Sequence, residues 1–327
     1  MSPDKSRETA FSHLIGASTA MRDVLATAER AAQTDANVYI YGENGTGKEL
    51  IARAIHYSGA RRARPLITLD CTAIPDGLME SQLFGHVRGA FTGAVEAQDG
   101  VFALAHLGSL FIDEIGELSL PLQAKLLRVL QFREYTPVGG SQPRRVDVRF
   151  ITATNRDLRQ AAAQGTFRSD LFYRIAVIHI VIPPLRERRE DIPLLVDHFL
   201  KKFAAQYERP VRGVSAAAQE LFRQHAWPGN VRQLENCIEH GVIFAQDAML
   251  DLPDLHGFFD DPVMAGRPGA PIVPQPHFGG SLKELEEWYI LETLRRFSGN
   301  RTRTARFLGL SLRSLQYKLK RYDLKRR

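Results

Sequence analysis

The chain has 327 residues, 44% of them hydrophobic and 24% charged, which is enough for two or three domains with a sizeable buried core. Its apolar runs are too short to span a bilayer, and its first residues lack the apolar stretch of a secretory signal. Two cysteines without metal-ligand spacing, Cys71 and Cys237, exclude a disulfide framework, so we expect a soluble cytoplasmic protein.

The net charge of +6 is concentrated at the C-terminal end of the chain. Residues 281–327 hold 13 Lys/Arg and 5 Asp/Glu, whereas residues 1–280 hold 30 and 32. One interpretation of such a basic segment is an ordinary solvated face. The asymmetry nevertheless favours a tail that meets a polyanion while the body has another role.

Residues 14–184 alternate apolar, strand-like runs with amphipathic, helix-like runs, which is typical of an α/β sheet. The strand candidates are residues 38–41, 66–70, 109–112, 149–153 and 177–182. From residue 185 to about 255 the strands stop and helical periodicity takes over.

The first strand candidate leads into residues 42–49 (GENGTGKE), which have the spacing of a nucleotide phosphate loop. Glycines let consecutive backbone amides turn toward one centre, and the following helix N-terminus adds its positive end. Lys48 supplies a point charge for the β and γ phosphates. Because Glu49 stands where the generic pattern has Ser or Thr, the motif alone leaves open a glycine-rich turn without a ligand.

Residues 89–94 (GAFTGA) carry one aromatic and one hydroxyl side chain among glycines and alanines. They hold no titratable group, so they cannot be a catalytic site. Composition alone indicates a surface turn. Their position inside a nucleotide-binding core instead favours a flexible tip that touches another macromolecule.

Polar side chains follow two further strand candidates. Asp113 and Glu114 end the apolar run at 109–112, where Asp113 is suited to hold magnesium and Glu114 to orient or activate water. Thr154 and Asn155 end the next strand, where the γ-phosphate is expected. Acids at a strand end are usually only solvated, but their place after a phosphate loop favours a hydrolytic site.

Arg168 and Arg174 follow, and Asp170 between them can pair locally. They are either ordinary surface arginines or charge-stabilising fingers for a neighbouring subunit's phosphate. Such fingers are worth about 10³–10⁵ in rate in comparable enzymes. The second interpretation requires a ring or another head-to-tail oligomer.

Composition shifts sharply after the helical region, since ten of the 24 residues at 257–280 are Gly or Pro, which predicts a linker. A capping box at residues 281–284 restarts a helix. Over residues 282–297 this helix repeats apolar side chains that offer a dimer surface, namely Leu285, Trp288, Leu291 and Leu294.

Residues 302–322 have the pattern of a helix-turn-helix, with Ala305 and Leu308 facing inward and Gly309 at the turn. Ser311 caps a second helix that places Leu312, Leu315 and Leu319 on one stripe. The alternative is a short basic helical hairpin, which the separation of charged and apolar side chains argues against. Neutralising about six phosphates gives a log–log salt slope near −5. The expected DNA-binding residues are Arg301, Arg303, Ser311, Arg313, Ser314, Gln316, Tyr317, Lys318 and Lys320.

Together these motifs resemble those of the bacterial enhancer-binding proteins, the AAA+ ATPases that activate sigma-54 RNA polymerase. The resemblance runs from about residue 14 to the C-terminus, apart from the linker. It rests on GENGTGKE at 42–49, LFGH at 83–86 before GAFTGA at 89–94, FIDE at 111–114, PPLRER at 183–188 and WPGNVR at 227–232. Glu49 after the lysine is usual in that family. Residues 299–320 are similar to its Fis-type DNA-binding domain.

The resemblance implies an α/β fold, an AAA+ P-loop parallel-sheet ATPase, over residues 1–184. An α-helical lid over 185–256, the linker over 257–280 and a small all-α helix-turn-helix domain over 281–327 complete it. ATP and Mg²⁺ are the implied cofactors. The implied ATP-binding residues are Leu14, Ile15, Gly16, Gly42, Glu43, Asn44, Gly45, Thr46, Gly47, Lys48, Glu49 and Arg232.

Roles within that site follow from the same resemblance. Asp113 holds the metal, Glu114 supports hydrolysis, and Thr154 with Asn155 senses the γ-phosphate. Arg168 and Arg174 act across the subunit interface of a hexamer, and Arg232 couples the nucleotide to the lid. The implied sigma-54 contact is the tip loop Gly89, Ala90, Phe91, Thr92, Gly93 and Ala94.

Two positions depart from the family pattern. Asp70 stands where the family commonly has an Asn thought to hold the hydrolytic glutamate, so we expect two facing carboxylates and an altered pH dependence of the ATPase. An ATPase pH profile that Asp70→Asn leaves unchanged would contradict this. Gln82 replaces the usual Glu before residues 83–86 and is expected to be tolerated.

The expected function is a sigma-54-dependent transcriptional activator that binds upstream DNA and uses ATP hydrolysis to open the promoter complex. The alternatives are a DNA-binding repressor or accessory regulator that does not engage sigma-54, and a phosphate-loop kinase. The intact loop at 89–94 argues against the first, and the C-terminal module has no role in the second. Only about 13 residues precede the ATPase core, so we expect control by another protein or by expression level.

Overall fold

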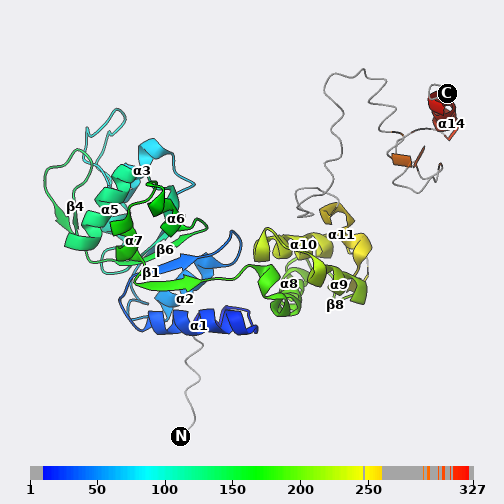
Figure 1. Cartoon of the computed structure of the whole chain (residues 1–327), viewed down its shortest axis with the longest axis horizontal. Helices are drawn as coiled ribbons and strands as arrows, with labels where there is room; N and C mark the ends of the chain where they lie inside the picture. Colours follow the sequence, from blue (N-terminus) through cyan, green and yellow to red (C-terminus); the bar gives the residue numbers. More distant parts are fainter. Residues whose placement is uncertain are drawn as a thin grey trace, which may run out of the picture. The chain divides into compact units, whose positions relative to one another are not determined.

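The structure is a computed structural model of the chain (Figure 1). It describes residues 10–245 and 247–259, the single positions 290, 293, 294, 301, 304, 305 and 310, and residues 312–323. The chain divides into two compact units, Met1–Gly266 and Arg267–Arg327. In the described part, no helix is long and apolar enough to cross a membrane.

The first unit is built on a five-stranded parallel sheet in the order β2-β3-β6-β1-β7. Its strands are β1 (Val38–Tyr41), β2 (Leu66–Asp70), β3 (Ser109–Asp113), β6 (Arg149–Thr154) and β7 (Ile178–Val181). All five predicted strands are therefore confirmed, with ends that differ by at most one residue. Because the strands are parallel, the segments that follow β1, β2, β3 and β6 emerge at one edge of the sheet.

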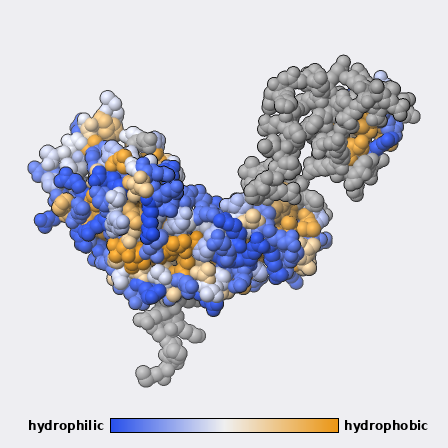
Figure 2. All heavy atoms as spheres, viewed as in Figure 1, coloured by the Kyte–Doolittle hydropathy of each residue, from blue (hydrophilic) through white to orange (hydrophobic). Residues whose placement is uncertain are grey.

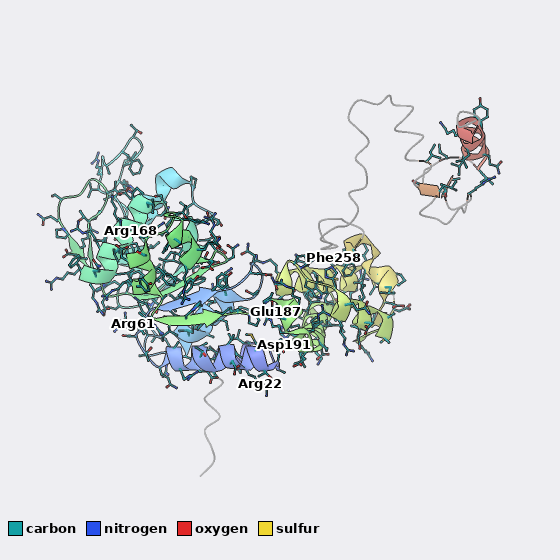
Figure 3. All side chains as sticks on the ribbon, viewed as in Figure 1. Arg22, Arg61, Arg168, Glu187, Asp191 and Phe258 are labelled. Carbon is teal, nitrogen blue, oxygen red and sulfur yellow. The ribbon has the colours of Figure 1, made fainter. Side chains whose placement is uncertain are left out.

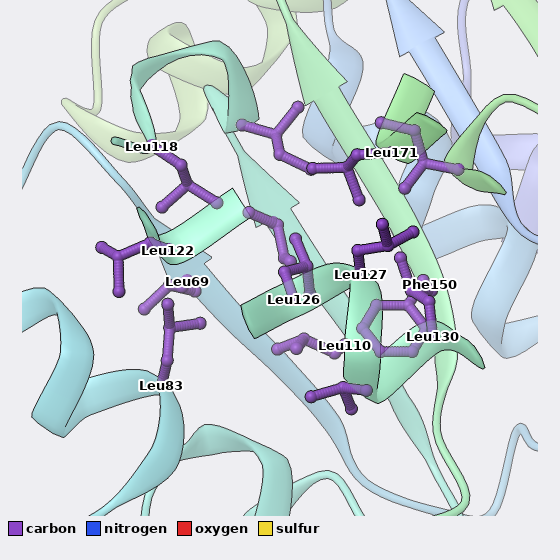
Figure 4. Packing of buried hydrophobic residues seen from close by; sticks show 14 of the residues in the cluster. Leu69, Leu83, Leu110, Leu118, Leu122, Leu126, Leu127, Leu130, Phe150 and Leu171 are labelled. Atoms are coloured by element: carbon purple, nitrogen blue, oxygen red, sulfur yellow. The ribbon is translucent and has the colours of Figure 1, made fainter. Parts of the chain in front are cut away.

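Side chains alternate between the two faces of this sheet, as the period of a strand requires. On one face Val38 and Ile40 of β1 pack with Phe111 of β3 in a cluster that includes residues of α1 and α2. On the other face Leu110 and Ile112 pack with leucines of α5 (Figure 4). Burial on both faces explains why these strands read as continuous apolar runs.

Helices cover both faces and connect the strands. They are α1 (Thr19–Ala32), α2 (Lys48–Tyr57), α3 (Asp76–Phe84), α4 (Val101–Leu104), α5 (Leu120–Phe132), α6 (Leu158–Ala163) and α7 (Ser169–Ile175). Short 3-10 turns lie at Ala10–His13, Ile115–Glu117, Leu185–Glu187 and Arg189–Asp191. Two short antiparallel strands that the sequence did not predict, β4 (Glu134–Tyr135) and β5 (Arg144–Arg145), form a small hairpin.

The lid follows the sheet and has its own core. Its helices are α8 (Ile192–Gln206), α9 (Ala216–Gln224), α10 (Asn230–Phe244) and α11 (Leu252–Phe259). Trp227 is fully buried in this core and donates its indole N–H to the carbonyl of Phe222 at 2.8 Å. The visible face of the described residues is largely hydrophilic, with apolar patches between polar ones (Figure 2).

Two predictions for the lid need correction. The region from 185 to 255 is not purely helical, because β8 (Gly213–Val214) pairs in parallel with β9 (Met249–Leu250). The linker predicted at 257–280 also begins too early, since α11 continues to Phe259 and Phe258 is buried in the lid core. Residues 260–280 lie outside the described part of the chain.

In the second unit the described helix is α14 (Leu312–Asp323). Leu315 and Leu319 are buried with Ile290 and Ala305, as the predicted stripe and the predicted inward position require. Leu312 is 41% exposed, so the prediction that it shares the buried stripe with Leu315 and Leu319 is wrong. Leu294 is partly buried against this core, and the predicted dimer surface stays a prediction. Outside the described residues lie Leu285, Trp288, Leu291, Leu308 and Gly309.

Candidate functional site

The phosphate-loop motif forms a tight loop between β1 and α2. Gly45 and Gly47 have φ of +77° and +102°, a left-handed backbone that side chains other than glycine rarely adopt. A Cβ at Gly45 would also lie 2.3 Å from the carbonyl oxygen of Gly229 in the lid. Helix α2 begins at Lys48, so its free N–H groups and positive end open onto the loop.

Lys48 is buried, and its ammonium group is held by three oxygen atoms. Its Nζ donates to the carbonyl of Gly42 at 3.0 Å, to Asn44 Oδ1 at 3.3 Å and to Glu114 Oε1 at 3.2 Å. The ion pair joins the phosphate loop to the end of β3, with side chains only 7% and 12% exposed. The structure thus brings together the lysine and the acid that the sequence placed 66 residues apart.

Glu114 is fixed from both of its carboxylate oxygens. Its backbone is left-handed, with φ of 51°, which turns the residue away from the strand direction at the end of β3. Oε2 accepts from Thr154 Oγ1 and from the backbone N–H of Asn155, both at 3.1 Å. The Asn155 side chain also donates to Asn44 Oδ1 at 3.1 Å. The two predicted γ-phosphate sensors therefore contact both the acid and the phosphate loop.

Asp113 lies beside Glu114 at the same sheet edge, and its Oδ1 accepts the backbone N–H of Glu114 at 3.0 Å. Burial raises the pKa of Asp113, and the Lys48 ammonium opposes this shift. Carboxylate oxygen is the ligand type that Mg²⁺ takes from proteins, usually one or two such groups together with substrate phosphates. The half-buried carboxylate of Asp113, which lines the same cavity as the phosphate loop, fits that requirement.

Asp70, the chain's departure from the family pattern, ends β2. Its Oδ1 accepts from the backbone N–H of Thr72 at 2.8 Å and from Thr72 Oγ1 at 2.7 Å. The β2–β3 register sets Asp70 beside Asp113, whereas the described hydrogen bonds of the Glu114 carboxylate go to other groups. Asp70 thus adjoins Asp113 rather than pairing with Glu114 as expected. Its predicted effect on the ATPase pH profile stays a prediction.

A cavity of about 320 Å³ joins these groups to the lid. It is lined by Asn44, Gly45, Gly47, Lys48, Glu49, Leu50, Asp70, Thr72, Asp113, Glu114, Val231, Arg232 and Glu235. Lysine, arginine and helix-end amides on one side and carboxylates on the other suit a magnesium-bound polyphosphate. Arg232 of α10 therefore reaches the site from the lid, as predicted.

Leu14, Ile15 and Gly16 lie outside the lining of that cavity. Leu14 packs against the sheet core and Ile15 against the lid core. Asp191, labelled in Figure 3 where the chain passes from the sheet to the lid, fixes the next residues. Its carboxylate accepts from the backbone N–H of Ala17 at 2.6 Å and from the backbone N–H and hydroxyl of Ser18 at 2.7 and 2.8 Å.

The two candidate arginine fingers are exposed on or beside α7. Arg168 (Figure 3) pairs with Asp170 at 2.7 Å, the local partner foreseen for it. Arg174 donates to the carbonyl of Leu130 at 3.2 Å, and its own carbonyl accepts from Asn37 at 3.0 Å. Asn37 precedes β1, whereas the phosphate loop follows β1. Arg174 therefore lies at the opposite sheet edge from its own subunit's nucleotide site.

The loop at 89–94 is closed by hydrogen bonds from Gly89 N–H to the Ala94 carbonyl at 2.9 Å and from Ala94 N–H to the Phe91 carbonyl at 3.0 Å. Phe91 is 40% exposed, and its ring packs edge-on against His86, with ring centroids 5.0 Å apart. Thr92 is exposed. The loop is thus closed by its own backbone hydrogen bonds and exposes both side chains predicted for a protein contact.

In the helix-turn-helix unit, Arg301, Ser314, Gln316 and Tyr317 are exposed, and Lys318 is half-buried. Arg303 and Ser311 lie outside the described residues, as do the side chains of Arg313 and Lys320. Elsewhere, two residues with no role in the sequence prediction, Arg186 and Asn230, bond directly to the phosphate loop. They stand within the motifs PPLRER and WPGNVR, which were the only available signal.

Three family models match consecutive parts of the chain. They are the sigma-54 interaction domain over residues 14–181, the AAA+ ATPase lid domain over 186–264 and the Fis family of bacterial regulatory proteins over 281–322. The regulatory protein AtoC of Escherichia coli (strain K12) is 47% identical over 315 residues, covering 96% of this chain and 68% of that protein.

Two further relatives agree with this assignment. The Nif-specific regulatory protein of Herbaspirillum seropedicae is 55% identical over 227 residues, or 69% of this chain and 42% of that protein. The crystal structure of NtrX from Brucella abortus in complex with ATP is similar at 35% identity with a TM-score of 0.72, covering 94% of this chain and 68% of that one. The chain therefore belongs to the sigma-54-dependent transcriptional activators, AAA+ ATPases that carry a Fis-type DNA-binding domain.

Proposed function

We propose that Phe91 and Thr92 contact sigma-54 directly and that ATP hydrolysis moves this loop to convert the closed polymerase–promoter complex into the open one. The observation that carries the proposal is the exposure of both side chains on an ordered loop of the same body that holds the ATP cavity. A contact loop that is a covalent part of the ATPase core can turn a nucleotide-dependent shift into force on a partner.

The route from cavity to loop is short. Asp70 and Thr72 line the cavity, and α3 is the one helix between them and His86 at the base of the loop. His86 is buried, contacts Ser81 of α3 at 2.8 Å and carries the ring of Phe91. A displacement of the β2 end would therefore be passed through α3 to His86 and to the loop.

For the chemistry, we propose that Asp113 holds Mg²⁺, which when bound neutralises charge on the phosphates. The Lys48 ammonium would leave Glu114 and bind the β and γ phosphates instead. Glu114 is then free to accept a proton from the attacking water, while Thr154 and Asn155 hold its carboxylate in place. Asp113, Glu114, Thr154 and Asn155 act from the ends of β3 and β6, and Lys48 acts from the start of α2.

We propose a ring, a hexamer in the simplest case, in which Arg168 and Arg174 serve the neighbouring subunit's nucleotide. The position of Arg174 at the sheet edge away from its own phosphate loop supports this. We also propose upstream activating DNA as the ligand of the C-terminal domain. A cytoplasmic location follows because DNA and RNA polymerase lie there in bacteria.

The test is ATP-dependent open-complex formation by sigma-54 polymerase, with ATPase activity recorded in parallel for the parent, Thr92→Ala and Val95→Ala. Val95 is 74% exposed and adjoins the loop, so its substitution is a matched control. We expect opening by the parent and by Val95→Ala, and loss of opening with retained hydrolysis for Thr92→Ala. Hydrolysis without opening by the parent would point to an accessory regulator instead.

A further inference from the structure

The phosphate loop is bonded to the lid by side chains that do not touch the phosphate site itself. Arg186, in the 3-10 turn that follows β7, forms a two-point ion pair with Glu43, at 2.8 Å from Nη1 to Oε2 and 2.6 Å from Nη2 to Oε1. Asn230, the first residue of α10, donates from Nδ2 to the same Oε2 at 3.1 Å and to the carbonyl of Asn44 at 3.0 Å. Three segments therefore meet at one carboxylate.

Asn230 is held on its other side as well. Its Oδ1 accepts the backbone N–H of Leu185 at 2.8 Å, so one amide group bonds the sheet-to-lid connection and the phosphate loop together. The residue is completely buried, and its left-handed backbone, with φ of 52°, suits asparagine better than most side chains. Few other residues could occupy this conformation and make these bonds.

The same helix carries a nucleotide-facing group. The backbone N–H groups of Val231 and Arg232 donate to the carbonyl of Gly45 at 3.0 and 3.3 Å, and the Arg232 side chain lines the ATP cavity. A rotation of α10 must therefore displace the phosphate loop or break these bonds. The Arg186 ion pair lowers the pKa of Glu43, and the bond from Asn230 lowers it further. The carboxylate is thus ionised at neutral pH and keeps both donors.

We propose that Glu43, Arg186 and Asn230 form a latch that makes the lid, and with it Arg232, follow the phosphate loop. Arg186 and Asn230 are positioning residues, since they act on nucleotide through Arg232 and the loop. The proposal deepens the ATPase function and rests on the nucleotide contact proposed for Arg232. It does not depend on the sigma-54 contact.

Asn230→Asp tests the latch, because it keeps the size of the side chain and its acceptor for Leu185 while turning the donor toward Glu43 into a repelling carboxylate. We expect the KM for ATP of the full chain to rise about ten-fold or more, the scale of a lost hydrogen bond to a charged group, with a smaller change in kcat. Arg232→Ala should also raise KM in the parent. In the Asn230→Asp background it should add less than about two-fold, because the arginine is already uncoupled.

A second substitution distinguishes the latch from general damage. Glu43→Gln in the Asn230→Asp background supplies an amide that can donate to the new carboxylate. We expect KM to return part of the way toward the parental value, because the ion pair of Glu43 with Arg186 is not restored. Glu187→Gln is the matched control. It removes a carboxylate from the same turn, 3.9 Å from Arg186, and should leave KM and kcat at the parental values.

Should Asn230→Asp fail to fold, Arg186→Gln breaks the ion pair at a side chain that is 40% exposed. It should raise KM in the same direction and be equally non-additive with Arg232→Ala. An unchanged KM, or additive effects with Arg232→Ala, would overturn the proposal. These assays contain no polymerase, so a parent that hydrolyses ATP without opening promoters would contradict the sigma-54 contact and leave the result on the latch intact.

Discussion

Lys48 Nζ lies 3.2 Å from Glu114 Oε1, so the phosphate-loop lysine and the acid proposed to activate water neutralise each other. ATP phosphates would compete for the same ammonium. Nucleotide binding would therefore both fill the loop and release the carboxylate. The ion pair compensates two largely buried charges, as such charges require.

Glu114→Gln should separate binding from hydrolysis. The amide cannot take a proton from water, so we expect ATP turnover to fall by about 10²–10⁴, the usual contribution of a general base. ATP binding should persist, because the lysine loses its competing partner. Phosphate release and equilibrium nucleotide binding measure the two effects. Glu117→Gln, the same change in the ion pair with Arg156, is the control and should leave turnover unaltered. Equal losses in both variants would contradict the role of Glu114.

Arg174 should act on the nucleotide of the adjacent subunit. Arg174→Ala alone should lower hydrolysis by about 10³-fold or more, as arginine fingers do. Lys48→Ala alone should abolish it. Mixing the two inactive proteins creates interfaces with an intact lysine on one side and an intact arginine on the other, and random assembly should restore about a quarter of the sites.

The measurement is ATPase activity across mixing ratios, with Arg22→Ala as the control for loss of an exposed arginine on α1. That variant should retain parental activity by itself. A mixture that stays inactive at every ratio would show that the two residues serve the same subunit's site.

Local signals in the sequence were sufficient for the sheet and for most of the phosphate site. The strands are continuous apolar runs because both of their faces are buried. Asp113 and Thr154 are the last residues of β3 and β6, and Lys48 follows β1 at the end of the phosphate loop. Parallel pairing then brings these residues together. Residues 213–214 and 249–250 are too short for any periodicity to reveal that they pair.

Other features depend on tertiary contacts that composition does not encode. Gly257 and the following prolines indicated a linker, yet Phe258 is buried and Phe259 packs against Trp227 with ring centroids 6.1 Å apart. The bonds of Asn230 join segments 186 residues apart in the sequence. The motif that contains Asn230 was recognisable in the sequence, but the motif does not predict which groups its buried side-chain amide bonds to.

His56 should make the first unit less stable in acid. It is a buried residue of α2, with Nε2 3.1 Å from the Arg64 carbonyl and Nδ1 2.9 Å from Ser109 Oγ. Burial lowers its pKa below the ordinary value of 6.5. The unfolded chain therefore takes up the proton first. The free energy of unfolding should keep its whole contribution from neutral His56 above about pH 6.5. It should fall as the pH drops through and below that value.

Urea unfolding of the parent and His56→Gln between pH 8 and pH 5 measures this dependence. The variant should be less stable at pH 8, where it lacks the ring's packing, but its stability should decline less steeply with acid. Burial also lowers the pKa of His179, so a residual slope should remain. Parallel curves for the two proteins would show that His56 does not contribute to the acid sensitivity.

The C-terminal domain should divide its DNA contacts between phosphates and bases. Affinity for a target duplex, measured by fluorescence anisotropy over a range of KCl, should give a log–log slope near −5 for about six neutralised phosphates. We assign the exposed Arg301 to a phosphate contact, so Arg301→Ala should weaken binding to all sequences and reduce the slope by about one. Gln316→Ala, on the exposed side of α14, should instead keep the slope and narrow the gap between target and random duplexes. An unchanged slope for Arg301→Ala would remove that residue from the phosphate contacts, and an undiminished preference for the target in Gln316→Ala would mean that other residues of the domain read the bases.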